Sequence, residues 1–164
     1  MKYCPTCSSE LEKKLIENIE REVCPDESCN FKNWGNPVPV AAGILRYNDK
    51  YILARNSEWK NGVFSMITGF VDRNEVPEKT IVREVDEEIG LQCSDVKFIG
   101  HFNLEKMNQL IIAFHLEVVG EIKLNSEIAE FILVSSDELE AYDFGEFALT
   151  KNVVDTWFES YRHA

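Results

Sequence analysis

Residues 69–91 have the sequence GFVDRNEVPEKTIVREVDEEIGL, and this stretch decides both the fold and the chemistry of the chain. Pro77 suits the first turn of a helix, because its missing N–H has no partner there in any case. Gly90 suits the left-handed position that ends a helix. The sequence therefore predicts a helix over residues 77–89, preceded by a loop over residues 69–76.

The predicted helix has two unlike faces, because successive residues turn by about 100°. Its apolar stripe comprises Ile81, Val85 and Ile89. Glu84, Glu87 and Glu88 fall on a neighbouring face, where carboxylates repel one another. A solvated acidic face is one interpretation. The other is a site for a hard divalent ion such as Mg²⁺, which prefers oxygen ligands and removes the repulsion. Arg83 precedes Glu87 by one turn and can hold it by a forked ion pair.

This stretch resembles the Nudix box, the signature of hydrolases that cleave a nucleoside diphosphate linked to another moiety. The matching residues are Gly69, Glu75, Arg83, Glu84, Val85, Glu87, Glu88, Gly90 and Leu91. Many members have glycine just before the first glutamate, where this chain has Asn74. Asparagine tolerates a positive φ better than most residues, so we expect the loop to form.

The resemblance implies a mechanism and assigns residues to it. The three helix glutamates would bind Mg²⁺ or Mn²⁺, helped by the carbonyl of Gly69. The ions would polarise the diphosphate and a water molecule that attacks one phosphorus. Glu75 would brace the loop through Arg83 or a backbone amide.

The resemblance also directs attention to residues at the edges of the box. Some members use another glutamate beyond the box as a metal ligand or base. Glu127 and Glu130 lie in that region, and Glu127 matches the position better. An exposed charged loop is the alternative. Phe70, the aromatic residue after the first glycine, would stack on a base, or else it belongs to the core.

A second motif lies near the N-terminus. The pairs Cys4/Cys7 and Cys24/Cys29 match the spacing of a four-thiolate zinc site. Disulfides or unrelated thiols are the alternatives, but no signal peptide precedes the pairs, so we expect a reducing, cytoplasmic setting. Apolar residues recur between the pairs at helical spacing, yet an unbroken helix would hold the thiols about 25 Å apart. We therefore predict a hairpin, and a zinc ribbon over residues 1–35.

Length, composition and charge set further limits. A chain of 164 residues suffices for one domain with a core plus a small attachment. No apolar run approaches the roughly 20 residues needed to cross a membrane. The net charge of −12 argues against unspecific binding to nucleic acid, although bound cations would still let an anionic nucleotide bind. His101, His115 and His163 lack the spacing of a metal-ligand pair.

The remainder indicates an α/β domain over residues 36–164, joined to the ribbon by residues 36–39. The predicted strands span residues 40–47, 51–55, 63–68, 96–104, 109–119 and 130–134. A short helix opens at Ser136, and a terminal helix spans about 147–161. Together with the resemblance, this pattern predicts a Nudix-type α/β/α sandwich with a mixed sheet.

A zinc ribbon before a Nudix domain is similar to the NADH pyrophosphatase group and its relatives that act on FAD or ADP-ribose. That likeness implies a homodimer with the ribbon at its interface. The group's Trp-Pro-Phe-Pro signature is absent, since residues 101–106 are HFNLEK, which makes FAD and ADP-ribose comparable candidates to NADH. We therefore carry three hypotheses. They are a metal-dependent pyrophosphatase of such nucleotides that releases a nucleoside monophosphate, a housecleaning nucleoside triphosphate pyrophosphatase, and a nucleotide-sensing module without catalysis.

Overall fold

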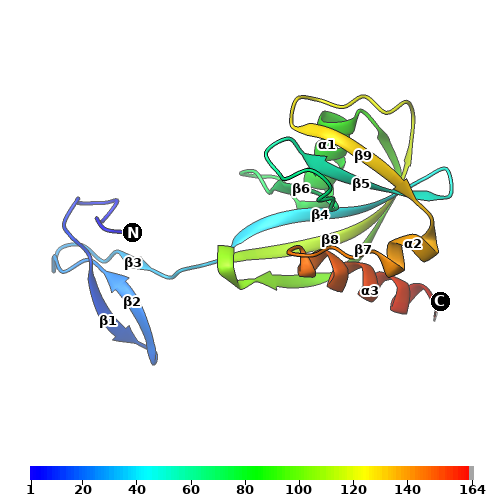
Figure 1. Cartoon of the computed structure of the whole chain (residues 1–164). Coiled ribbons are helices and arrows are strands. Elements are labelled where there is room, and N and C mark those ends of the chain that lie inside the picture. The colour runs from blue at the N-terminus through cyan, green and yellow to red at the C-terminus, as the bar shows by residue number, and fades with distance from the viewer. Residues whose placement is uncertain (163–164) are drawn as a thin grey trace. The chain divides into compact units, whose positions relative to one another are not determined.

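The computed structural model describes residues 1–162, with side chains to residue 160, so His163 lies outside the described residues. The chain forms two compact units, Met1–Pro37 and a larger one that begins at Val38 (Figure 1). The boundary predicted from the sequence lies after residue 35, two residues earlier. No helix among the described residues is long and apolar enough to cross a membrane.

The first unit is a small antiparallel sheet. Its strands are β1 (Glu12–Ile16), β2 (Ile19–Val23) and β3 (Lys32–Asn33). Glu17 and Asn18 form the turn between β1 and β2, with φ of 52° and 65°. Two left-handed residues in a two-residue turn match the twist of the flanking strands. The hairpin prediction is therefore confirmed.

The second unit contains a mixed six-stranded sheet in the order β7-β8-β4-β5-β9, with β6 paired to the first half of β4. Its strands are β4 (Val38–Tyr47), β5 (Lys50–Asn56), β6 (Ile67–Phe70), β7 (Gln92–Leu104), β8 (Gln109–Val119) and β9 (Ile128–Val134). β4 and β8 run parallel, and the other pairs are antiparallel. The predicted mixed sheet is confirmed.

Helices cover both faces of this sheet (Figure 1). They are α1 (Pro77–Ile89), α2 (Ser136–Ala141) and α3 (Ala148–Arg162), with a short 3₁₀ turn at Glu105–Met107. One hydrophobic core lies under α1, and the other lies between the sheet and α2 and α3. The predicted apolar stripe of α1 is fully buried, and Gly43 lets it come close, since a Cβ there would lie 2.9 Å from Ile81.

Several element boundaries differ from the prediction: β5, β9 and α3 by one or two residues, and the following three for clear reasons. β7 begins at Gln92 instead of residue 96, because an irregularity between Cys93 and Asp95 breaks the alternation that marks a strand. The strand expected over residues 63–68 is β6, Ile67–Phe70, because only those residues find partners on β4. The expected linker over residues 36–39 is also too long, since β4 starts at Val38.

Candidate active site

Glu84 of α1 lies against β6, and Gly69 makes this close approach possible. Gly69 pairs with Ala41 of β4. A Cβ at Gly69 would lie 2.1 Å from Oε1 of Glu84, far inside van der Waals contact. Glu84 therefore occupies the space that any side chain at position 69 would need. Glycine is required there for close approach, and not for an unusual φ.

Glu88 is the most deeply buried acid of the site. Its exposed fraction is 7%, and no hydrogen bond or ion pair to its carboxylate is found among the described residues. Burial, reinforced by the charges of Glu84 and Glu127, raises the pKa of Glu88 to about 7. Burial also raises the pKa of Glu84. A largely buried carboxylate without a protein partner is destabilising unless a cation or a proton compensates its charge, and Glu88 faces a cavity where an ion can approach, so this donor set fits a divalent ion.

Arg83 links the loop before α1 to the helix glutamates. Its Nε and Nη2 fork onto the two oxygens of Glu75, each at 3.1 Å. Its Nη1 reaches Glu84 at 2.8 Å and Glu87 at 3.1 Å. The expected fork onto Glu87 is thus wrong. Glu75 faces the guanidinium from the loop with both oxygens, whereas Glu87, 56% exposed on the same helix, offers one.

Glu75 is held on several sides. Besides Arg83, it accepts a hydrogen bond from Thr80 Oγ1 at 2.8 Å and one from the backbone N–H of Asp72 at 3.3 Å. The Arg83 contact is the main cause that lowers the pKa of Glu75 to about 2. The loop also needs Asn74 at φ 67°, as its sequence position predicts. Glu75 is thus a fixed, ionised brace of the loop.

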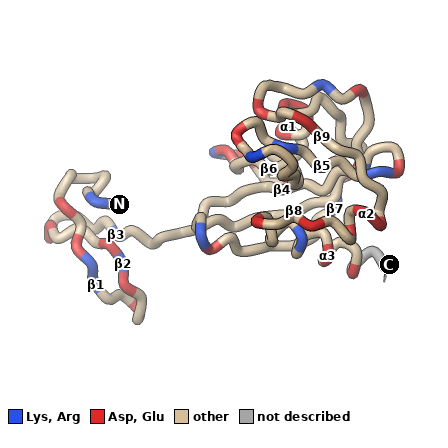
Figure 2. The backbone as a smooth tube through the Cα atoms, in the orientation of Figure 1, with Lys and Arg blue, Asp and Glu red and all other residues tan. Residues whose placement is uncertain are grey.

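Glu127 and Glu130, the two glutamates beyond the box, have different surroundings. Acidic residues occur on both α1 and β9 (Figure 2). The charge of Glu127 contributes to the raised pKa values of Glu84 and Glu88, so it lies near both. Glu130 is instead paired with Nε of Arg55 at 2.6 Å. Glu127 is therefore the acid whose charge acts on the α1 carboxylates, while Glu130 is neutralised by Arg55.

The α1 carboxylates do not converge as tightly as ligands on one ion. Among the described residues, the only group of three or more His, Cys, Asp or Glu whose donor atoms lie within 4.8 Å of one another is formed by cysteines. Glu84 and Glu87 turn toward Arg83, which relieves their mutual repulsion. Binding an ion would require at least Glu84 to exchange Arg83 for the cation.

A small cavity of about 50 Å³ adjoins Glu88. The lining residues that sequence reasoning missed are Asn56, Trp59 and Thr68. No spacing rule connects them with Glu88, because they come from β5, the following loop and β6. Phe70, at the end of β6, was predicted as a possible contact, and its exposed fraction of 58% shows that the core alternative is wrong.

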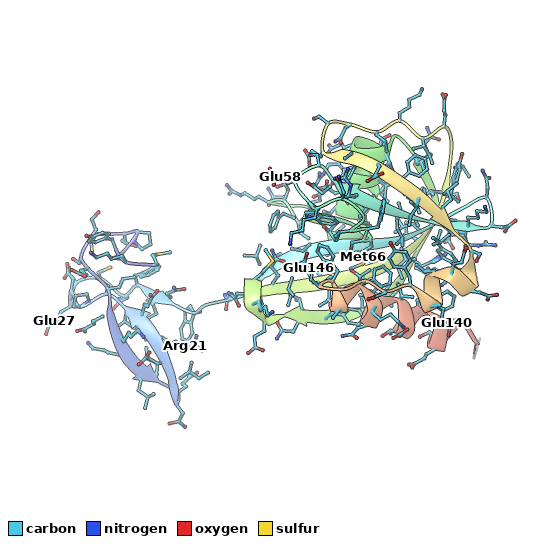
Figure 3. The ribbon with its side chains drawn as sticks, viewed as in Figure 1. Arg21, Glu27, Glu58, Met66, Glu140 and Glu146 are labelled. Atoms are coloured by element: carbon cyan, nitrogen blue, oxygen red, sulfur yellow. The ribbon has the colours of Figure 1, made fainter. Side chains whose placement is uncertain are left out.

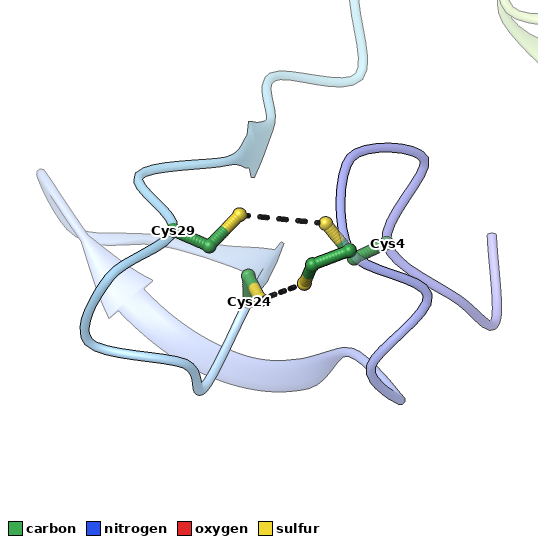
Figure 4. A group of neighbouring side chains, drawn as sticks. Cys4, Cys24 and Cys29 are labelled. Carbon is green, nitrogen blue, oxygen red and sulfur yellow. Dashed lines mark hydrogen bonds between the residues drawn. The ribbon is translucent and has the colours of Figure 1, made fainter.

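The four cysteines of the first unit come together (Figure 4). The Sγ atoms of Cys4 and Cys29 are 3.7 Å apart, and those of Cys7 and Cys24 are 3.3 Å apart. Zn–S bonds of about 2.3 Å in a tetrahedron put sulfurs about 3.8 Å apart, whereas a disulfide needs about 2.05 Å. All five cysteines lie in the described part of the chain, and none forms a disulfide. The disulfide alternative is not supported.

The first unit also needs a cross-link on energetic grounds. Its buried hydrophobic residues, within residues 1–37, are Cys4, Val23 and Cys24. A unit of this size without a real core is not stable alone, and a structural metal is the usual remedy. The thiolate cluster therefore fits zinc in both geometry and energetics.

Comparisons with known proteins agree with this geometry. A family model described as "NUDIX domain" matches residues 37–154. A protein named NAD-capped RNA hydrolase NudC from Pseudomonas aeruginosa is 30% identical over 122 residues, which cover 74% of this chain and 42% of that protein. The protein of the same name from Mycobacterium tuberculosis is 34% identical over 96 residues, covering 57% and 31%. The chain thus spans less than half the length of these relatives.

Solved structures share the fold. A NUDIX hydrolase from Nitrosomonas europaea superposes with a TM-score of 0.82 at 21% identity, covering 100% of this chain and 94% of that one. A MutT protein from Methanosarcina mazei superposes with a TM-score of 0.65 at 22% identity, covering 78% and 98%. At such identities the likeness shows the fold alone.

Proposed function

Since the chain belongs to the Nudix hydrolase family, we propose that it hydrolyses the diphosphate bond of a nucleoside diphosphate derivative. The substrate is of FAD, NAD(H) or ADP-ribose type. The reaction depends on a divalent metal and releases a nucleoside monophosphate. The observation that carries this proposal is the Glu88 side chain, which is 7% exposed, lines the cavity and has no hydrogen-bond partner among the described residues, next to Glu84, which lies against Gly69. Carboxylates placed in this way lower the stability of the fold unless a cation binds them, which supports a site for metal-dependent chemistry.

The α1 glutamates would hold the ion. Glu84, Glu87 and Glu88 would be its ligands, with Glu84 and Glu87 exchanging their contacts with Arg83 for the ion, and the carbonyl of Gly69 would add a neutral oxygen. When bound, Mg²⁺ or Mn²⁺ polarises the diphosphate and lowers the pKa of a coordinated water.

The other residues prepare this chemistry. Arg83 and Glu75 keep the loop in place through their forked pair. The charge of Glu127 contributes to the raised pKa of Glu88. We propose that Glu127 is the general base that accepts the proton of the attacking water. The cavity of about 50 Å³ has room for a few water molecules, so it suits a water next to Glu88.

The substrate class rests on the relatives and on Phe70. The relatives are named as hydrolases of NAD-capped RNA. Residues 101–106 lack the Trp-Pro-Phe-Pro signature of the NADH pyrophosphatase group, which keeps FAD and ADP-ribose equal to NADH as candidates. Phe70 offers an exposed flat ring beside the box, which suits a base.

The test is product analysis on a pool of NADH, FAD, ADP-ribose and nucleoside triphosphates with Mg²⁺ or Mn²⁺. We expect a nucleoside monophosphate from at least one of the first three. Release of pyrophosphate from a triphosphate would favour the housecleaning activity instead. If no compound in the pool is cleaved, the proposal is overturned and the nucleotide-sensing module is favoured. Glu88→Gln should be inactive. Glu78→Gln, which makes the same change in the first turn of the same helix, is the matched control and should keep its activity.

We also propose that the first unit is a zinc ribbon, whose structural zinc is held by Cys4, Cys7, Cys24 and Cys29. The second unit is then the hydrolase domain. We further propose that two copies of the chain form a homodimer through the ribbon. The expected cytoplasmic location stays a prediction. In support of pairing, Leu15 and Ile19 near the hairpin tip are 73% and 53% exposed. Sedimentation at micromolar concentration should give a dimer that Leu15→Glu converts to a monomer. A wild-type monomer would contradict the pairing.

A further inference from the structure

We propose that Trp59, braced by Phe147, determines specificity by stacking on the base of the substrate. The inference rests on the proposed function, because it concerns the same site. Trp59 lies in the loop between β5 and β6 and lines the cavity that also contains Glu88 and Thr68. Figure 3 labels Glu58, the neighbour of Trp59 in this loop, and Met66, which lines the same cavity from the interior of the unit.

The backbone around Trp59 is fixed by hydrogen bonds. Its N–H donates to the carbonyl of Asn56 at 3.0 Å, and its own carbonyl accepts from Nη1 of Arg55 at 3.2 Å. The N–H of Ser57 donates to the carbonyl of Glu127 at 2.7 Å. The loop that carries Trp59 is thus tied to the segment that carries a proposed catalytic acid.

The ring of Trp59 is fixed as well. Its centroid lies 4.6 Å from that of Phe147, with the planes inclined by 38°. Phe147 comes just before α3, so it holds the indole from the side of that helix. A ring braced from one side loses little conformational entropy when a ligand contacts it elsewhere.

The size of the cavity places the base outside it. About 50 Å³ admits water and a phosphate oxygen, but not a purine or flavin ring. A base must therefore lie at the mouth of the cavity. Thr68 lines the cavity and is exposed, and Phe70 projects from the same face of β6, since side chains two apart share a face about 7 Å along the strand. Trp59 therefore shares the cavity lining with Thr68, and Phe70 offers a second exposed ring two residues farther along β6.

This arrangement selects for a ring and not for one base. Stacking needs only a flat π-face, and contributes roughly 10- to 100-fold in affinity for each base. The chain would then favour diphosphates that carry a base near the scissile bond over diphosphate esters without one, and would tolerate different bases.

The test compares ADP-ribose with diribosyl diphosphate, which has the same linkage but no base. We expect Trp59→Leu to raise KM for ADP-ribose by 10- to 100-fold with kcat within threefold, and to leave the base-free ester unchanged. Trp59→Phe should keep most of the affinity. Phe147→Leu, which removes the ring that braces Trp59, should cause a smaller rise in KM. Phe98→Leu, at an exposed aromatic residue of β7 outside the cavity lining, is the control.

Equal effects of Trp59→Leu on both substrates, or a fall in kcat with KM unchanged, would overturn the proposal. Calorimetry gives a second readout that needs no turnover. In the Glu88→Gln background, Trp59→Leu should weaken ADP-ribose binding at least tenfold, and unchanged affinity would also overturn it. If the wild type cleaves nothing, the proposed function fails, whereas the calorimetric comparison still decides the role of Trp59.

Discussion

At the residue scale, Glu88 is both a proposed metal ligand and a buried acid whose charged form lowers the stability of the folded protein. Burial raises its pKa from the ordinary 4.5 to about 7, so the folded protein binds more protons than the unfolded chain between these values. Stability should therefore fall as the pH rises through this window and stay lower above it.

Glu88→Gln removes this penalty. Without divalent ions, we expect the variant to be more stable than the wild type at pH 8 by about 3 kcal/mol, and about equal to it near pH 4.5. Urea unfolding with a chelator at both pH values measures this. Adding Mg²⁺ should stabilise the wild type and not the variant. An equal response of both proteins to Mg²⁺ would remove Glu88 from the metal site.

Gly69 offers a second test at this scale. A Cβ would meet Oε1 of Glu84 at 2.1 Å, so Gly69→Ala must displace that carboxylate. Because a displacement of about 1 Å can cost on the order of 100-fold in rate, we expect kcat to fall at least tenfold while the fold persists. Gly100→Ala is the control, since its Cβ would meet only the ring of Phe102 at 3.3 Å. Full activity of Gly69→Ala would show that Glu84 need not lie there.

At the element scale, the loop before α1 depends on one left-handed residue. Asn74 has φ 67°, a conformation that asparagine and glycine tolerate and β-branched residues do not. Asn74→Gly should leave stability and turnover nearly unchanged, whereas Asn74→Val should destabilise by about 1–2 kcal/mol. Thermal unfolding of both variants, with Arg73→Val as the neighbouring control, measures the difference. A harmless Asn74→Val would mean that the loop has another accessible form.

The elements also show how far the sequence alone could lead. α1 and β8 have the predicted bounds, because proline, glycine and an unbroken apolar pattern mark them locally. The Arg83–Glu75 contact agrees with the role that the resemblance implies for Glu75, but helix spacing alone assigns the fork of Arg83 to Glu87 and not to Glu75. Trp59 was missed because it too lies in a loop. Its nearness to Glu88 depends on how β5, β6 and α1 pack.

At the scale of the whole molecule, the two units should differ in their response to metal removal. The first has only Cys4, Val23 and Cys24 as buried hydrophobic residues, while the second has a core on each face of its sheet. A strong zinc chelator should abolish amide protection in β1 and β2 and leave it in β4 and β8. Hydrogen exchange with mass spectrometry checks this, with Cys93→Ser as a control cysteine outside the cluster. Persistent protection of the hairpin would mean that it needs no zinc.

The central claim is that the α1 carboxylates capture divalent ions. Anomalous diffraction from crystals soaked in millimolar MnCl₂ tests it most directly. We predict a manganese peak about 2.1 Å from oxygens of Glu84 and Glu88, with Glu84 released from its 2.8 Å contact with Arg83. An empty site in which Glu84 still contacts Arg83 would contradict the account.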